Sequence, residues 1–157
     1  AFPVVGVDPD APLKQEARFG VERPGDRPEE CGLGHCGVDV VAARGTPVVA
    51  VEDAVVVRIV RDPLRRSGRY VRLRHDDGRF TSYMHLDDIN DDIAVGVELE
   101  AGSPVGTLGR TGIRDSVPHL HFALEEVDQD GNLRFIDPTL ELEDAYRSQR
   151  FRRRSGS

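Results

Sequence analysis

The chain has 157 residues, a net charge of −7 and a hydrophobic fraction of 38%, and its mean hydropathy is −0.42. This length predicts one domain with a core of its own, and no apolar run approaches the ~20 residues that a membrane-spanning helix needs. The negative charge, and the lack of a basic patch interleaved with aromatic residues, argue against nucleic acid as a partner.

The N-terminal segment is predicted to be an extended arm. Five of the ten prolines fall in the first thirty residues, which excludes a regular helix there. We expect an arm over residues 1–18 whose Phe2, Val4 and Val5 tuck against the main domain at 19–149. The sequence shows no secretory signal. Because its first residue is Ala rather than Met, we expect that upstream residues have been removed, and export stays open.

The two cysteines, Cys31 and Cys36, flank His35 at short spacing. An even count at this spacing favours a small disulfide loop, and therefore an oxidising compartment. Two free thiols are the alternative, because so short a loop needs specific geometry. Zinc ligation by the pair is disfavoured, since the chain has no second cysteine pair.

From residue 38 onward, short runs rich in valine and isoleucine alternate with turn residues, which is typical of β-strands. The turn sequence Asp76-Asp77-Gly78, which contains an Asp-Gly pair, predicts a hairpin. In the run before it, Val71, Leu73 and His75 share one face, so His75 is interpreted as a core histidine. The fold class is therefore mainly β, a compact antiparallel sheet. The predicted strands include 38–41, 47–51, 54–60, 69–75 and 79–85.

The end of the chain is predicted to hold one short helix and a tail. The helix is expected at 139–149, directly after Pro138. Four arginines lie between Arg150 and Arg154, and such a terminal charge run predicts a disordered basic tail over 150–157. The acidic stretch at 87–92 lacks the spacing of a calcium loop, so we interpret it as a solvated loop. Residues 128–132 are interpreted as a hairpin turn, whose D-x-D-G does not extend into a calcium loop.

Two of the five histidines, which are candidate metal-binding or catalytic residues, lie in Pro118-His119-Leu120-His121-Phe122. Side chains repeat with period two along a strand, so both imidazoles project from one face, roughly 7 Å apart. Two imidazoles on a rigid element suit either a pair of metal ligands or one ligand beside a general base. Spacing alone does not decide between these roles.

A second cluster, His35-Cys36-Gly37-Val38-Asp39, can supply the remaining ligands. In an extended strand His35 and Asp39 would be about 13 Å apart, but Gly37 permits a bend that brings the imidazole and the carboxylate together. Two histidines and one aspartate leave a position for water, which is the pattern of a catalytic zinc site. His85 then becomes a candidate for stabilising transition-state charge.

These motifs resemble peptidase family M23, the lysostaphin-like or LytM-type zinc endopeptidases. The resemblance rests on three ordered motifs and spans roughly residues 19–140. The motifs are His35-x-Gly37-x-Asp39, Tyr83-Met84-His85-Leu86 and Pro118-His119-Leu120-His121-Phe122. Two positions depart from the family pattern: Ala54 replaces a common glycine, and Val117 replaces a small residue before Pro118.

The resemblance implies that Zn²⁺ is bound by His35, Asp39 and His121, with His119 as general base and His85 as the second catalytic histidine. It further implies a periplasmic or extracellular bacterial enzyme that cleaves peptide bonds in peptidoglycan. One alternative is a non-catalytic M23-like module that binds cell wall or activates another hydrolase.

A cupin-type oxygenase or isomerase is the other alternative. Gly112, His119-x-His121 and Glu125 come close to a cupin motif, and two histidines with a carboxylate also hold Fe(II). No histidine follows His121, however, so the second cupin motif is missing. Glu125 then serves instead to orient a metal ligand.

Overall fold

The computed structural model describes residues 1–6, 36–64, 66–113, 117–145 and 147. His35, Cys31, most of the predicted N-terminal arm and the basic tail lie outside the described residues. The described strands are β1 (Val38–Val41), β2 (Pro47–Val49), β3 (Ala54–Val60), β4 (Arg69–His75), β5 (Phe80–Ile89), β6 (Glu98–Leu99), β7 (Pro104–Leu108), β8 (His119–Val127) and β9 (Leu133–Ile136).

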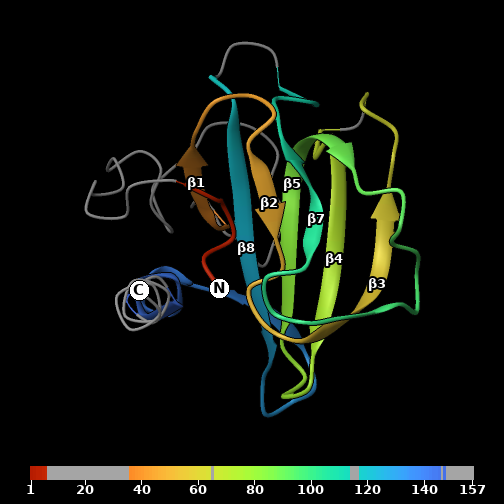
Figure 1. Cartoon of the computed structure of the whole chain (residues 1–157). Helices are drawn as coiled ribbons and strands as arrows, with labels where there is room; N and C mark the ends of the chain where they lie inside the picture. The colour runs from red at the N-terminus through yellow and green to blue at the C-terminus, as the bar shows by residue number, and fades with distance from the viewer. Residues whose placement is uncertain (7–35, 65, 114–116, 146, 148–157) are drawn as a thin grey trace, which may run out of the picture.

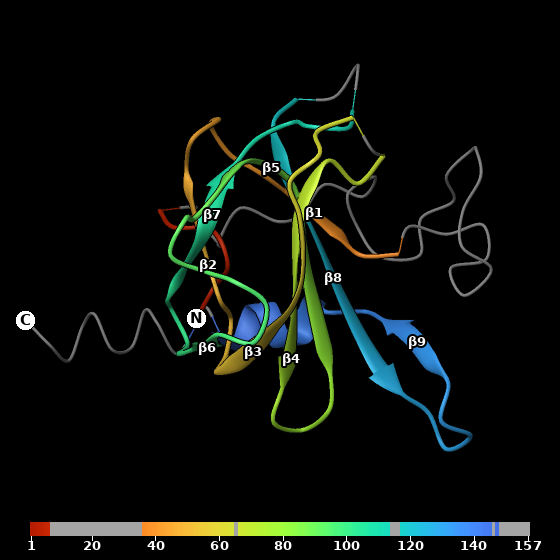
Figure 2. The ribbon, with the colours of Figure 1, turned by 90° about the vertical axis from the view of Figure 1, so that its right-hand side faces the viewer.

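The strands form an antiparallel sheet in the order β1-β8-β5-β4-β3-β6. β9 pairs with β8, while β2 pairs with β7, which also joins β5 (Figure 1). In Figures 1 and 2, β2 and β7 lie over one face of the main sheet. The prediction of a mainly β, antiparallel fold is confirmed.

Strand β5 pairs with β4 along one edge, and because it bends at His85 it has two successive partners along the other edge. It pairs with β8 through Met84, and from Leu86 onward it pairs with β7. His85 has a φ of 63°, the one non-glycine residue with positive φ among those described, and this strained conformation turns the strand. The sequence predicted that this strand ends at His85; it continues to Ile89 because the bend passes it to a new partner.

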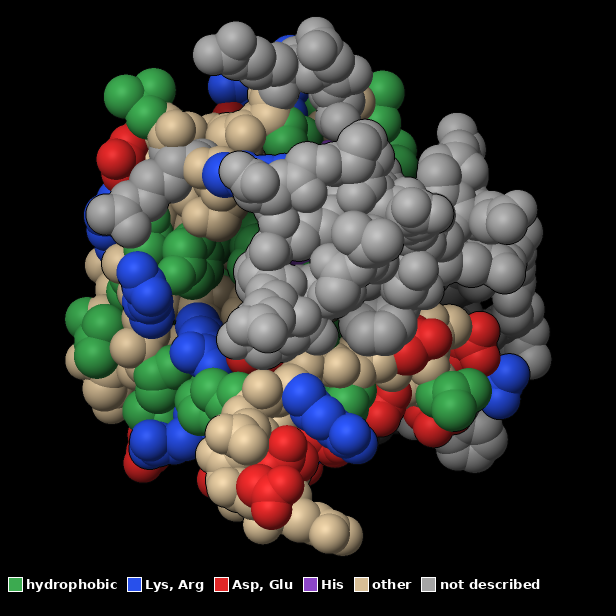
Figure 3. All heavy atoms as spheres, turned by 180° about the vertical axis from the view of Figure 1, so that it is seen from behind, with side chains coloured by type: hydrophobic (Ala, Val, Ile, Leu, Met, Phe, Trp, Pro, Cys, Tyr) green, Lys and Arg blue, Asp and Glu red, His purple; other side chains and the backbone are tan. Residues whose placement is uncertain are grey.

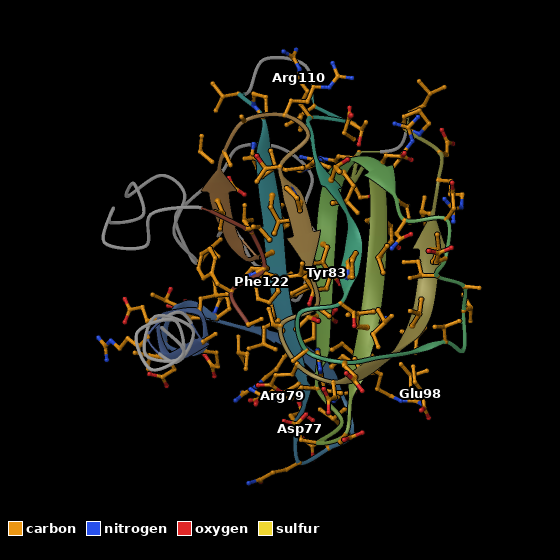
Figure 4. The ribbon with its side chains drawn as sticks, in the orientation of Figure 1. Asp77, Arg79, Tyr83, Glu98, Arg110 and Phe122 are labelled. Atoms are coloured by element: carbon orange, nitrogen blue, oxygen red, sulfur yellow. The ribbon has the colours of Figure 1, made fainter. Side chains whose placement is uncertain are left out.

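The core lies between the main sheet and the β2–β7 layer. Tyr83 and Phe122 are buried at its centre with their rings edge to face, 5.4 Å apart (Figure 4). His75 is also buried, as predicted; its Nδ1 donates to the carbonyl of Asp53 (3.0 Å) and its Nε2 contacts the hydroxyl of Thr81 (2.8 Å). Because both ring nitrogens have hydrogen-bond partners, the core tolerates this histidine.

The described N-terminal residues confirm two of the three predicted contacts. Val4 is buried and bridges to Val48, and Phe2 packs against the core. Val5 is exposed, contrary to the prediction. The reason is that Val5 lies in the turn that follows the bridge at Val4, beyond the residue that packs inward.

A short helix follows the last strand, as predicted, with helical residues at 139–145 and 147. The Asp137 carboxylate accepts from the backbone N–H of Thr139 (3.0 Å), so it caps the helix ahead of Pro138. None of the described helical residues belongs to a segment long and apolar enough to cross a membrane.

Candidate metal and catalytic site

The pairing of β1 with β8 creates the centre of the site. Its antiparallel register sets Asp39 opposite His121 and Val41 opposite His119. Directly opposed side chains share a face of the sheet. Oδ1 of Asp39 therefore lies 3.0 Å from Nδ1 of His121 and 3.6 Å from Nε2 of His119. The three side chains are largely buried, with 9–16% of each side chain exposed.

Gly37, just before β1, makes room for this arrangement. A Cβ atom at this position would lie 2.2 Å from the carbonyl oxygen of Phe122 and 3.0 Å from Nε2 of His121. The absence of a side chain thus lets the chain pass close to β8 and its imidazole. This close approach is a more specific reason for the glycine than the bend expected from the sequence.

Both candidate catalytic histidines have their tautomer set by a backbone carbonyl. Nδ1 of His119 donates to the carbonyl of Val117 (2.9 Å), and Nδ1 of His85 donates to the carbonyl of Thr111 (2.8 Å). Because a carbonyl only accepts, Nδ1 carries the proton in each neutral ring. Each Nε2 is therefore a proton acceptor, and that of His119 faces Asp39.

His85 is brought to the two β8 histidines by the bend in β5. Its ring centroid lies 5.2 Å from that of His119 and 6.1 Å from that of His121. Burial lowers the pKa of His85 to about 4, an effect that its hydrogen bond to Thr111 only partly opposes. His85 is therefore neutral near pH 7, and it must gain a proton on Nε2 before it can donate to an oxyanion.

Thr111 connects His85 to the strands around it. Its hydroxyl donates to the carbonyl of Leu86 (2.7 Å) and accepts from the backbone N–H of Arg69 (3.0 Å). Gly68 packs so closely that an added Cβ would lie 2.2 Å from the carbonyl oxygen of Thr111. No sequence pattern predicts this role of Thr111, because it contacts His85 through a backbone carbonyl.

The residues present fit a zinc ion. The Nδ1 of His121 and the Oδ1 of Asp39 are 3.0 Å apart, close to the roughly 3.3 Å that separates two ligands of tetrahedral zinc with bonds of 2.0–2.1 Å. Within the described residues no group of three metal-binding side chains forms. The third expected ligand, His35, lies outside that part of the chain.

Other predicted residues are placed elsewhere. His75 lies in the core and takes no part in the histidine cluster. Glu125 does face the same way as His121, but its carboxylate lies 3.3 Å from Nη2 of Arg72. Cys36 is disulfide-bonded, as the sequence favoured.

Comparison with known proteins shows the family. The model of peptidase family M23 matches residues 33–138, a range that contains all five predicted site residues. Peptidoglycan DD-endopeptidase ShyC of Vibrio cholerae is 39% identical over 88 residues, which cover 56% of this chain and 19% of that protein. Cell division protein DipM of Caulobacter vibrioides is 30% identical over 106 residues, 68% of this chain and 16% of that protein.

Solved structures give the same result. The catalytic domain of the antimicrobial peptidase lysostaphin from Staphylococcus simulans has a TM-score of 0.64 and 29% identity, covering 80% of this chain and 89% of that domain. A zinc-containing peptidase from Vibrio cholerae also has a TM-score of 0.64, with 25% identity, covering 88% of this chain and 38% of that one.

The fold and the histidine cluster thus define a domain of the peptidase class. More particularly, the chain belongs to peptidase family M23. It spans about a fifth of the length of the curated relatives ShyC and DipM. The cupin alternative receives no support from these matches.

Proposed function

We propose that this chain is a zinc-dependent endopeptidase that hydrolyses peptide bonds of bacterial peptidoglycan. The observation that carries the proposal is the cluster on one sheet face, where Oδ1 of Asp39 lies 3.0 Å from Nδ1 of His121 and 3.6 Å from Nε2 of His119. A potential metal-ligand pair and a proton acceptor are thereby adjacent, as metal-assisted hydrolysis requires.

In this proposal Asp39, His121 and His35 hold the zinc ion. Bound zinc supplies a Lewis acid that polarises a peptide carbonyl and lowers the pKa of water. Asp39 and His121 come from neighbouring strands that are hydrogen-bonded to each other, so the sheet holds both side chains in place without a flexible loop.

His119 serves as the general base. Its Nδ1–H donates a hydrogen bond to the carbonyl of Val117. Nε2 therefore takes the proton from the attacking water. The same Nε2 then returns the proton to the leaving amine. His85 lies beside it with the same tautomer. Because it is neutral near pH 7, it takes up a proton from solvent at Nε2 before it stabilises negative charge on the carbonyl oxygen.

The substrate and the compartment are proposed from two kinds of support. The relatives ShyC and ShyA of Vibrio cholerae are named peptidoglycan DD-endopeptidases. The disulfide at Cys36 requires an oxidising environment, such as the periplasm or the cell exterior. We therefore propose that the enzyme is secreted and acts on the cell wall in one of these compartments.

Digestion of purified peptidoglycan tests the proposal. The zinc-loaded protein should release new amino groups, and mass analysis of the fragments should locate the cleaved peptide bond. A chelator should abolish the release, and added zinc should restore it. If the zinc-loaded protein bound peptidoglycan but released no amines from any peptidoglycan tested, the chain would instead be a non-catalytic wall-binding module.

A further inference from the structure

Three arginines share the sheet face that carries Asp39 and His121. Arg58 of β3 lies opposite Arg72 of β4, and Arg74 lies opposite Phe80 of β5. In Figure 3, basic and hydrophobic side chains are interspersed on the left, over β3 and β4. This local positive charge contrasts with the net charge of −7 of the whole chain.

Arg72 contacts both an aromatic ring and a carboxylate. Its guanidinium carbon lies 4.2 Å from the centroid of the Phe80 ring, and Nη2 lies 3.3 Å from Oε1 of Glu125. Yet Nε and Nη2 are both buried without a hydrogen-bond partner among the described residues. Such unsatisfied buried donors are costly, and they call for an explanation.

The two unsatisfied atoms form one edge of the guanidinium group. Nε–H and Nη2–H point in the same direction, so they make a fork that fits the two oxygens of a carboxylate. The Phe80 ring fixes the plane of this fork. Glu125 compensates the charge of Arg72 but approaches Nη2 alone, without hydrogen-bond geometry.

The strand register places this fork within reach of the catalytic cluster. Ala123, two residues beyond His121, lies opposite Ser82, and Ser82 lies opposite Arg72. His121 and Arg72 are therefore two strands apart across the sheet and two residues apart along the strands, which corresponds to roughly 12 Å between their Cα atoms. An extended peptide of about four residues spans that distance.

We propose that Arg72 is a specificity-determining residue that binds a carboxylate of the peptide substrate, about four residues from the cleaved bond. The inference rests on the proposed peptidase function. Because both atoms are buried in this structure, the substrate carboxylate reaches them when the Glu125 side chain moves aside. It then takes the place of the Glu125 oxygen at Nη2 and adds a second hydrogen bond at Nε. Among the described strand residues on this face, Arg72 lies beside two further arginines, Arg58 and Arg74, and one glutamate. An added anion therefore reduces the repulsion between the three cations.

The test uses peptidoglycan fragments in which each carboxylate in turn is converted to a carboxamide. For the wild-type chain, one carboxamide should lower kcat/KM by roughly 10- to 100-fold, the value of a charge-assisted bidentate contact. Arg72→Gln should lower cleavage of the unmodified fragment by a similar factor, mainly through KM. The variant should also no longer distinguish that carboxylate from its amide.

Two further variants keep the test decisive if Arg72→Gln does not fold. Glu125→Gln removes the competing carboxylate and should lower KM for the unmodified fragment. Arg134→Gln, which breaks an exposed pair with Glu126, is the matched control and should leave both constants unchanged. Equal cleavage of every carboxamide by the wild-type chain, or an unchanged KM in Glu125→Gln, would overturn the inference while leaving the peptidase proposal intact. No cleavage of any fragment would overturn both.

Discussion

Nδ1 of His121 lies 3.0 Å from Oδ1 of Asp39, and the two residues face each other across the β1–β8 ladder. This separation matches neighbouring ligands of one zinc ion. The antiparallel pairing of β1 with β8 alone brings the two side chains together. Their contact joins residues that are 82 positions apart in the chain.

Replacing either residue should remove zinc. Asp39→Ala and His121→Ala each delete one proposed ligand, so zinc affinity should fall by at least about 100-fold, beyond the usual effect of an outer-shell change. Competition with a chromophoric chelator measures this affinity. Glu126→Ala, on the same strand but paired with Arg134, is the control. Unchanged zinc affinity in both ligand variants would show that zinc binds elsewhere.

A methyl group at Gly37 should disturb both folding and metal binding. Its Cβ would meet the carbonyl oxygen of Phe122 and Nε2 of His121, and overpacking of this kind costs about 1–3 kcal/mol in the free energy of unfolding. Denaturant unfolding and the zinc assay should therefore both report a loss for Gly37→Ala.

Gly131→Ala is the matched control for Gly37. Gly131 has positive φ but open space around it, so its substitution should cost about 1 kcal/mol of stability with normal zinc affinity. If Gly37→Ala bound zinc as tightly as Gly131→Ala does, the close approach of β1 to His121 would not matter for the metal.

The Thr111 hydroxyl should act on catalysis through His85. Thr111→Val keeps the shape but loses the bonds to Leu86 and Arg69, each worth about 1 kcal/mol. We expect kcat to fall about tenfold as the carbonyl that orients His85 shifts, with KM and zinc content unchanged. Thr111→Ser should restore kcat, because the hydroxyl is kept. A Ser variant as slow as the Val variant would contradict this role.

Tyr83 should make the protein less stable in alkali. Complete burial raises its pKa from 10.0 to about 12, so the unfolded chain releases this proton at lower pH than the folded chain. The free energy of unfolding should therefore fall as pH rises above 10, by up to about 1.4 kcal/mol per pH unit until pH 12. Denaturant unfolding at several pH values measures the slope.

Two variants test whether Tyr83 causes this fall in the free energy of unfolding at alkaline pH, called here the alkaline slope. Tyr83→Phe should reduce it, although it also removes hydrogen bonds with Val51 and Thr81. Tyr70→Phe, at a partly exposed position of β4, removes a tyrosine but should keep the slope. The same slope in all three proteins would show that other groups cause the alkaline loss.

The strands and the core were predictable because their patterns are local. The alternation of apolar and polar residues along β4 predicted that Val71, Leu73 and His75 face the core. The Asp-Gly pair predicted the turn that follows. The two-residue repeat of side chains along a strand also predicted that His119 and His121 lie on one face. Such signals need only neighbouring residues.

The bend at His85 and the fork of Arg72 were not predictable, because they depend on contacts between distant strands. The positive φ of His85 exists because β5 changes partner from β8 to β7. The Thr111 carbonyl leaves no mark on the sequence, since any residue supplies a carbonyl. The roles within His119-Leu120-His121 came from the family resemblance and not from the spacing.

In the proposed mechanism His121 holds zinc while His119 moves a proton. The direct measurement is zinc stoichiometry and amine release from peptidoglycan in the same preparations of His119→Ala, His121→Ala and the wild-type chain. We expect His119→Ala to keep its zinc and to lose roughly 10²- to 10⁴-fold in activity, whereas His121→Ala should lose zinc and activity together. Zinc loss in His119→Ala, or full activity in His121→Ala, would contradict this division of roles.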